Sequence, residues 1–182
     1  MFCVKCGSEC EQFVDDNIVR YRCRSCNYVY YKNPYPCVSV LVINNQGKIL
    51  LGKRHKDSIF SEKWCLPCGY MEYEETYIAA AKREVKEEMG INIEPRGIIN
   101  VVSNNFENGV SSLVIVLLAY YEEQNNLVPG DDITEADWFD INGSLPPLAF
   151  SADNFIITKY RESINKFGEI TTITLEGNSF TS

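Results

Sequence analysis

The chain has 182 residues, enough for one ordinary domain or one domain with a small appendage. Its composition, 45% hydrophobic and 23% charged, is that of a globular protein with a core, and no run approaches the roughly 18 apolar residues of a membrane helix. The formal net charge is −8, and an acidic protein attracts polyanions poorly. We therefore expect neither a membrane nor a nucleic acid as partner, whereas a small phosphorylated substrate that arrives with metal is compatible with this charge.

The N-terminus leads directly into Cys3 and Cys6, without the basic segment and apolar core of a signal peptide. We therefore expect a cytoplasmic protein, in which thiols stay reduced. The eight cysteines then need an explanation other than disulfides.

Four of these cysteines form two CxxC pairs, in which Cys3 and Cys6 are followed after sixteen residues by Cys23 and Cys26. This spacing is typical of a closed, tetrahedral, structural Zn²⁺ site without a catalytic role. So short a segment rarely stabilises itself by core burial, and zinc supplies on the order of 10–16 kcal/mol to small finger peptides. Cys10 has a less suitable spacing. The functional alternative is a ribbon that docks on nucleic acid or protein.

The N-terminal elements are short. Residues 15–17 predict a turn between two brief strands, and residues 28–31 predict a third strand. Residues 33–36 contain two prolines and predict a linker. The predicted organisation is a zinc ribbon over residues 1–34 and a second domain over residues 35–182.

The second domain mixes strands and helices. Strands are predicted over residues 38–43, 48–53, 98–102, 113–121 and 136–139. One helix is predicted over residues 76–89, ended by Gly90, and a second is capped by Ser151. The second helix places near one face Phe155, Ile156, Tyr160, Ile164 and Phe167. Residues 170–175 are β-like and have no predicted place. This order indicates a mixed α/β or α+β sandwich.

The first of these helices carries Glu84, Glu87 and Glu88 at positions i, i+3 and i+4, which share one face. Like charges so close destabilise a helix by a few tenths of a kcal/mol per pair. Hard oxygen ligands are what Mg²⁺ or Mn²⁺ prefers, so a metal would turn this cost into a site. A solvated charged face is the alternative. Another face is apolar and carries Ile78, Ala81, Val85 and Met89.

The surrounding residues favour the metal site. Residues 69–91, here named the box segment, fit Gly-x5-Glu-x7-Arg-Glu-U-x-Glu-Glu-x-Gly-U at every fixed position, with U aliphatic. Chance agreement is on the order of 10⁻⁸ per start point at background residue frequencies, which excludes coincidence. The pattern is the signature of Nudix hydrolases, and the sequence resembles that family over about residues 36–165. A departure is Cys68, where the family commonly has Gly or Ala.

This resemblance implies an α/β/α sandwich around a mixed sheet and an enzyme that cleaves a nucleoside diphosphate linked to another group, X. Glu84, Glu87 and Glu88 are then expected to hold one to three divalent ions, Mg²⁺ or Mn²⁺. Arg83 is expected to orient these carboxylates, with Glu75 as its partner or as an outer metal contact. The metals lower the pKa of an attacking water and neutralise the diphosphate.

The remaining site residues follow less directly. Gly69 permits a loop geometry closed to residues with a side chain. The general base is Glu87 or a carboxylate from another loop, with Glu135, Asp131 and Asp132 as candidates. Arg54, Trp64, Gly69 and Glu135 are candidate substrate contacts. Further candidates for stacking on a base are Phe60, Tyr70 and Phe106, for which core or rim packing is the alternative.

The identity of X rests on weaker motifs. A ribbon joined to this domain resembles NADH pyrophosphatases, but their Ser-Gln-Pro-Trp-type segment is missing. Residues 138–151 instead resemble ribbon-bearing relatives linked to FAD and ADP-ribose. We therefore expect ADP-ribose or FAD ahead of NADH. The alternatives are a nucleotide-sensing binding module and a housecleaning enzyme for nucleoside triphosphates.

Three further features stay open. His55, the single histidine, is expected in a solvated loop. Cys65 and Cys68 form a third CxxC, which we interpret as buried small residues, with a redox-sensitive pair as the alternative. Related enzymes are often homodimers, so a homodimer is a further expectation.

Overall fold

The structure, a computed structural model, describes residues 1–106, 109–122, 126–167 and 173–174. The chain divides into two compact units, Met1–Pro34 and Tyr35–Ser182. Within the described ranges, no helix has both the length and the hydropathy that a membrane-spanning helix needs.

The first unit is a small antiparallel sheet with strand order β1-β2-β3. Its strands are β1 (Cys10–Asp15), β2 (Ile18–Cys23) and β3 (Val29–Tyr30). Asp16 and Asn17 join the first two strands with positive φ angles of 47° and 64°. Two positive φ angles are the backbone of a tight hairpin turn whose twist matches its strands.

The described part of the second unit contains an eight-stranded sheet of order β10-β5-β4-β9-β8-β11, with β6 against β5 and β7 against β4. The β4–β9 pair is parallel and the other pairs are antiparallel, so the predicted mixed sheet is confirmed. The strands are β4 (Tyr35–Asn44), β5 (Lys48–Arg54), β6 (Trp64–Cys65), β7 (Cys68–Tyr70), β8 (Glu94–Asn105), β9 (Ser111–Tyr121), β10 (Ile133–Asp140) and β11 (Ile173–Thr174).

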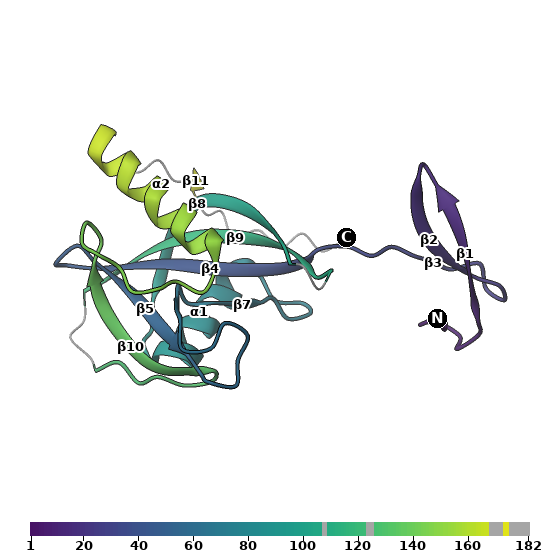
Figure 1. Cartoon of the computed structure of the whole chain (residues 1–182), viewed down its shortest axis with the longest axis horizontal. Helices are drawn as coiled ribbons and strands as arrows, with labels where there is room; N and C mark the ends of the chain where they lie inside the picture. Colours follow the sequence, from purple (N-terminus) through teal and green to yellow (C-terminus); the bar gives the residue numbers. More distant parts are fainter. Residues whose placement is uncertain (107–108, 123–125, 168–172, 175–182) are drawn as a thin grey trace. The chain divides into compact units, whose positions relative to one another are not determined.

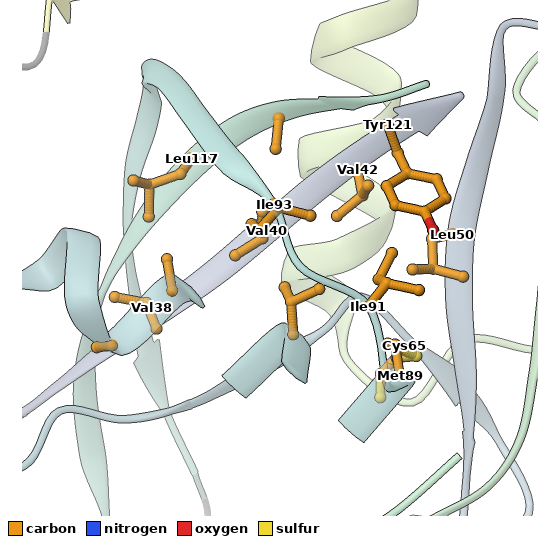
Figure 2. Close-up of a cluster of buried hydrophobic side chains, with 14 of the residues drawn as sticks. Val38, Val40, Val42, Leu50, Cys65, Met89, Ile91, Ile93, Leu117 and Tyr121 are labelled. Carbon is orange, nitrogen blue, oxygen red and sulfur yellow. The ribbon is translucent and has the colours of Figure 1, made fainter. Parts of the chain in front are cut away.

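One helix covers each face of this sheet, which makes the α/β/α sandwich (Figure 1). Helix α1 (Tyr77–Met89) packs on one cluster of buried residues and helix α2 (Ser151–Phe167) on the other. The alternation of strand side chains separates the two clusters, because successive residues of β4 point to opposite faces. Figure 2 shows the α1 side, with Val38, Val40 and Val42 along β4.

Strands β4 and β5 begin as the predicted hairpin and then separate. They pair at Ile43 and Ile49, beside the turn. Farther along, β7 pairs with β4 through Cys37–Ser39, and β6 pairs with β5 through Gly52 and Lys53. The separation therefore admits the segment that leads into α1, and fixes it to both strands.

Helix α1 has the predicted ends. Thr76 is its N-cap, and the Thr76 Oγ1 accepts a hydrogen bond from the Ala79 N–H at 3.2 Å. Gly90 ends the helix with a left-handed φ of 75°, which glycine adopts without steric cost. The burial differs from the prediction, because Glu84 and Glu88 lie on the buried side together with Val85 and Met89. The predicted apolar and acidic faces of the helix are therefore not separate.

Other elements differ in detail. The predicted strand over residues 98–102 extends to Glu94–Asn105, because the polar flanks also pair with β9. Helix α2 begins at Ser151 itself, and Phe155 is 46% exposed rather than on the buried face. Within the β-like tail, Ile173–Thr174 pairs with β8, and the other residues of 170–175 lie outside the described ranges.

Candidate functional site

The box segment brings its glycine against its first helical glutamate. Gly69 lies on β7, and a Cβ added there would stand 2.1 Å and 2.4 Å from the two carboxylate oxygens of Glu84. Any side chain at this position would displace the Glu84 carboxylate. The glycine is thus required for close approach, since its φ is not in the left-handed region.

Arg83 joins the acidic residues into one network. Its Nε and Nη2 donate to the two carboxylate oxygens of Glu75, both at 2.9 Å. Its Nη1 donates to Glu84 at 2.8 Å and to Glu87 at 3.0 Å, and Nη2 also donates to the Tyr70 carbonyl at 3.0 Å. The paired Glu75 and the other carboxylates raise the pKa of Arg83, so it stays charged. The forked guanidinium can hold several oxygens at once, which a lysine cannot.

Two of the three helical glutamates are buried carboxylates. Glu84 is 6% exposed and Glu88 is 2% exposed, whereas the Glu87 side chain is half exposed. Burial raises the pKa of Glu84, and Arg83 opposes that rise. Burial also raises the pKa of Glu88 well above its usual range, although the Cys68 N–H donates to Glu88 Oε2 at 3.0 Å. Both groups therefore favour a nearby positive charge.

This arrangement fits a cation for a specific reason. Buried carboxylates in proteins are normally paired with a cation or bound to a metal. Glu84 has Arg83 as a partner, but among the described residues no Lys, Arg or His pairs with Glu88. Arg83 competes with a metal for Glu84 and Glu87, and the three carboxylates do not converge as closely as the cysteine thiols described below. Binding of a divalent ion therefore requires that these side chains turn toward one another.

The carboxylates face a cleft of about 1000 Å³ in the second unit. Helix α1, strands β4 and β7, the ends of β8 and β9, the residues after β5 and the start of α2 contribute its walls. The acidic lining consists of Glu72, Glu84, Glu87, Glu88, Asp131, Asp132 and Asp153. Cleft volumes of several hundred to about 1000 Å³ accommodate ligands of nucleotide size.

Arg54 brings a positive charge into this cleft. Its Nη2 lies 2.7 Å from Asp132 Oδ2, and its Nε donates to the Ile59 carbonyl at 2.9 Å. The guanidinium also lies 5.4 Å from the ring centroid of Phe150. The side chain is 13% exposed, so it is held in place rather than solvated.

The structure brings most, but not all, of the predicted contacts to the cleft. Its lining includes Arg54, Phe60, Gly69, Tyr70, Phe106, Asp131 and Asp132. Trp64 does not line it, because its ring packs against Phe139 with centroids 4.8 Å apart. Glu135 does not line it either, and pairs with Lys53 at 2.8 Å. The His55 side chain is 42% exposed in its loop and lies beside Asp57.

Several cleft residues escaped the sequence reasoning, among them Phe150, Asp153 and Ser39. Phe150 directly precedes α2 and Asp153 lies in its first turn, far along the chain from the box segment, and Ser39 lies in a buried strand. An acid in an amphipathic helix and a serine in an apolar strand are both common, so neither residue carries a local signal of its own. Only the pairing of distant segments identifies them.

The four cysteines of the first unit lie together. The Sγ atoms of Cys3, Cys6, Cys23 and Cys26 are all within 4.8 Å of one another, with close pairs at 3.5–3.7 Å. Four sulfurs at about 2.3 Å from a tetrahedral metal ion are about 3.8 Å apart, so the cluster fits a zinc ion.

Two similar turns build this cluster. The Gly7 N–H donates to the Cys3 carbonyl at 2.9 Å, and the Asn27 N–H donates to the Cys23 carbonyl at 3.1 Å. Both Gly7 and Asn27 have positive φ angles, of 72° and 57°. Cys10 is outside the cluster.

The third CxxC has no such partners. Cys65 is fully buried and Cys68 is half-buried on the cleft wall. A hydrogen bond with Cys65 and burial raise the pKa of Cys68 well above its usual value, so it is a poor thiolate. Within the described ranges, these two cysteines belong to no cluster of metal-binding side chains.

Comparisons with known proteins agree with this geometry. Residues 34–158 match the NUDIX domain family. The NAD-capped RNA hydrolase NudC of Vibrio atlanticus is 30% identical over 150 residues, which are 81% of this chain and 52% of that protein. The ADP-ribose pyrophosphatase of Methanocaldococcus jannaschii is 34% identical over 123 residues, 67% of this chain and 72% of that protein.

A solved structure is also similar. The crystal structure of a NUDIX hydrolase from Nitrosomonas europaea superimposes with a TM-score of 0.76 at 26% identity and covers 91% of this chain and 93% of its own. This chain spans about half the length of the NAD-capped RNA hydrolase above. The family match covers more than half of the chain and includes the whole box segment, so the chain belongs to the Nudix family of hydrolases.

Proposed function

We propose that this protein is a divalent-metal-dependent pyrophosphohydrolase that cleaves an ADP-containing substrate, ADP linked to X, into two monophosphates. The observation that carries the proposal is the buried Glu84 and Glu88 pair on a cleft of nucleotide size, with Glu88 lacking a cationic partner among the described residues. A diphosphate and a buried carboxylate repel each other, so they need cations between them.

In this proposal Glu84, Glu87 and Glu88 hold Mg²⁺ or Mn²⁺, whose preferred ligands are carboxylate oxygens. A bound divalent ion neutralises the diphosphate and lowers the pKa of the attacking water. Arg83 keeps Glu84 and Glu87 within reach of each other through its 2.8 Å and 3.0 Å contacts. Bidentate pairing with Glu75 keeps Arg83 itself in place.

The remaining residues position groups or move a proton. The Cys68 N–H orients Glu88, and Gly69 leaves room for Glu84. We propose that Arg54 exchanges Asp132 for a substrate phosphate, because a guanidinium fork fits phosphate oxygens. Glu87, Asp131 and Asp132 all line the cleft and stay candidates for the general base, whereas Glu135 lies outside it and pairs with Lys53.

The identity of X is supported from two directions. One relative is named for ADP-ribose, and others are named for NAD-capped RNA. ADP-ribose, FAD, NADH and an NAD cap all contain ADP, so a site that recognises ADP serves each of them. We propose ADP-ribose or FAD as the substrate, with FAD supported by the sequence resemblance alone.

The first unit has a separate proposed role. We propose that residues 1–34 form a zinc ribbon in which Cys3, Cys6, Cys23 and Cys26 bind one Zn²⁺. A metal with four protein ligands has no open position for water or substrate, so its role is structural.

A substrate panel tests the proposed activity. The full chain is incubated with ADP-ribose, FAD, NADH and nucleoside triphosphates under Mg²⁺ and under Mn²⁺, and the products are separated by chromatography. We expect AMP and the complementary monophosphate from an ADP-containing dinucleotide. A chain that leaves all of these substrates intact with both metals would refute the proposal.

NAD-capped RNA is a second candidate substrate because several relatives carry that name. The net charge of −8 argues against tight binding of an RNA chain. Comparing kcat/KM for NAD-capped RNA with kcat/KM for free NAD shows whether the enzyme acts on RNA or on free dinucleotides. A capped RNA preferred at least tenfold would favour an RNA-directed enzyme.

A further inference from the structure

Three phenylalanine rings meet on the cleft wall. Phe60 and Phe106 each approach Phe150 edge to face, with ring centroids 5.5 Å and 6.5 Å apart. All three residues line the cleft, and Phe60 is 38% exposed. They come from the loop after β5, the end of β8 and the start of α2, so the fold gathers them from three distant segments. This group is here named the aromatic subsite.

The backbone at this subsite is under constraint. Phe60 has a φ of 60°, in the left-handed region that bulky residues avoid. Such strain is retained where surrounding structure or function requires it. The Lys63 N–H donates to the Phe60 carbonyl at 3.3 Å, and the Arg54 Nε donates to the Ile59 carbonyl, so the loop holds the ring toward Phe150.

A buried acid lies directly beside these rings. Asp153 is 3% exposed, lines the cleft, and its N–H donates to the Phe150 carbonyl at 3.1 Å. Its Oδ2 accepts from the Leu66 N–H at 3.2 Å, and its other oxygen, Oδ1, has no hydrogen-bond partner in the described ranges. Oδ1 retains some accessible surface and Asp153 lines the cleft, so this oxygen can accept a hydrogen bond from a ligand donor.

A second cleft residue carries a buried polar atom that lacks a partner among the described residues. Ser39 is 2% exposed and lines the cleft, and its Oγ is buried with no hydrogen-bond partner among the described residues. Ser39 pairs with Cys68, and the next strand residue, Val40, donates to the Pro67 carbonyl. Ser39, through its strand pairing, and Asp153, through its carboxylate, therefore both contact the same short segment, residues 66–68. The Asp153 side chain offers a hydrogen-bond acceptor, and the Ser39 side chain offers a hydroxyl.

We propose that the aromatic subsite, together with Asp153 and Ser39, binds the base of the substrate and selects a 6-aminopurine. This inference rests on the proposed function, because it assigns the base of the ADP half to a place in the same cleft. The rings hold a flat base by stacking and edge contacts. Asp153 Oδ1 accepts from the exocyclic amino group, and the Ser39 hydroxyl donates to a ring nitrogen.

A 6-oxopurine lacks the partner that Asp153 needs. Its carbonyl at position 6 places an acceptor where the amino group was. Above about pH 7, where Asp153 is ionised, two acceptors therefore face each other and the carboxylate stays unsatisfied. The purely structural alternative is that Asp153 serves only to hold the Leu66 N–H. In that case the nature of the group at position 6 does not matter.

Binding of AMP and IMP to the full chain, measured by isothermal titration calorimetry at about pH 8, where Asp153 is ionised, separates these alternatives without turnover. These nucleotides differ at position 6 and in the proton on the neighbouring ring nitrogen. We expect AMP to bind at least about tenfold more tightly than IMP. Equal affinity for the two, or no binding of either, would overturn the proposal.

Two variants identify the residues responsible. Asp153→Asn keeps an oxygen for the Leu66 N–H and adds an amide donor for a carbonyl, so the preference for AMP should fall about tenfold. Phe150→Leu should weaken AMP and IMP equally, by about tenfold, because it removes ring contacts common to both. An Asp153→Asn chain that keeps the full AMP preference would contradict the role of Asp153.

Matched substitutions outside the cleft control for general effects. Phe155→Leu alters an exposed ring of the same helix, and Asp137→Asn alters an exposed acid on β10, so neither should change nucleotide affinity. If Asp153→Asn does not fold, the ratio of AMP affinity to IMP affinity in the wild type and the loss of affinity in Phe150→Leu still test the proposed subsite.

The outcomes also separate this inference from the proposed function. Hydrolysis of ADP-ribose together with equal AMP and IMP affinity would leave the enzyme and reject the subsite. A clear AMP preference without any hydrolysis would support the subsite and reject the enzyme.

Discussion

The two units of this chain use buried polar groups in opposite ways. In the first unit, the buried residues are Cys3 and Cys23, and none of its large apolar side chains is fully buried; Phe2, Val4 and Val14 are exposed. The second unit has two clusters of buried apolar side chains on the faces of its sheet. The first unit therefore depends on its thiol cluster for stability, whereas the second has a core stable enough to bury the acids of its site.

The comparison separates the roles that we propose for the two metal sites. In the proposed zinc ribbon the four cysteines come from two short turns and the other side chains are not fully buried, so metal binding would supply folding energy. In the second unit a sheet and a capped helix already position the carboxylates, so the proposed divalent ion is not needed for folding and can serve the reaction. Each prediction below changes a residue in one of the two units and states the property that should be lost.

The largest effect is expected from loss of zinc in the first unit. Cys23→Ser removes one of four ligands, and zinc contributes on the order of 10–16 kcal/mol in small zinc-binding peptides, so residues 1–34 should unfold. Both tryptophans, Trp64 and Trp138, lie in the second unit, so their fluorescence reports on that unit alone. We expect an unchanged fluorescence transition and a lost set of amide NMR signals from the first unit.

Cys10→Ser is the matched control, because Cys10 lies in the same small sheet but outside the cluster. Its zinc content, measured by mass spectrometry, should stay at about one ion per chain, as expected for one four-ligand site. A folded first unit in a zinc-free Cys23→Ser chain would break the comparison.

Glu88→Gln should be the most harmful single change in the second unit for activity. The change removes a negative carboxylate that, in the proposed function, binds the divalent cations at the diphosphate. We expect kcat to fall at least about 10³-fold. Glu84→Gln should behave similarly. The fold should persist, since the amide has the same shape and a buried charge is removed. Turnover of ADP-ribose and the fluorescence transition are the measurements, with Glu162→Gln on the surface of α2 as control.

Asp153 sharpens the comparison by showing what a buried acid costs the second unit. Burial raises the pKa of Asp153 from 3.8 to about 7, while the Leu66 N–H and the charge of Arg54 oppose that rise and Cys68 also faces the carboxyl. The folded state therefore binds this proton more tightly than the unfolded state. The resulting stabilisation is fully present below pH 3.8 and is lost as the pH rises through about 7.

Asp153→Asn removes this titration, so it isolates the effect. Relative to the variant, the wild type should lose on the order of a few kcal/mol of unfolding free energy between pH 4 and 8. Urea unfolding followed by tryptophan fluorescence measures the difference at each pH. A difference that does not change with pH would show that Asp153 titrates normally.

Gly69→Ala should have the smallest effect on stability and a selective effect on catalysis. The new methyl group meets the movable end of Glu84, so the carboxylate shifts while the backbone stays. We expect kcat/KM to fall about 10–100-fold, as for other displaced catalytic groups. Gly47→Ala is the control. A methyl group at Gly47 meets no neighbouring atom, but the φ of 74° is a backbone conformation that alanine adopts only with strain.

The Gly47→Ala change should cost about 1–2 kcal/mol of stability and leave activity unchanged. The two alanine variants thus affect different properties, and measuring kcat/KM and the unfolding free energy for both tests this. Equal activity in the two would show that Glu84 tolerates displacement.

Much of the fold could be predicted from local patterns. The helix over Tyr77–Met89 follows from Thr76, the alanine-rich run and Gly90, which act within a few residues. Strands β6 and β7 could not be predicted, because two or three residues carry no periodicity. Their pairing exists only because β4 and β5 separate.

The site divides in the same way. The sequence by itself determined the acidic box segment and the two cysteine pairs, because their ligands lie at fixed spacings within one turn or helix. Only the tertiary structure decided that Trp64 packs against the core, that Glu135 pairs with Lys53 outside the cleft, and that Phe150 and Asp153 line the cleft. Spacing along the chain fixes which side chains share a helix face, whereas burial and contact depend on which distant segments the sheet brings together.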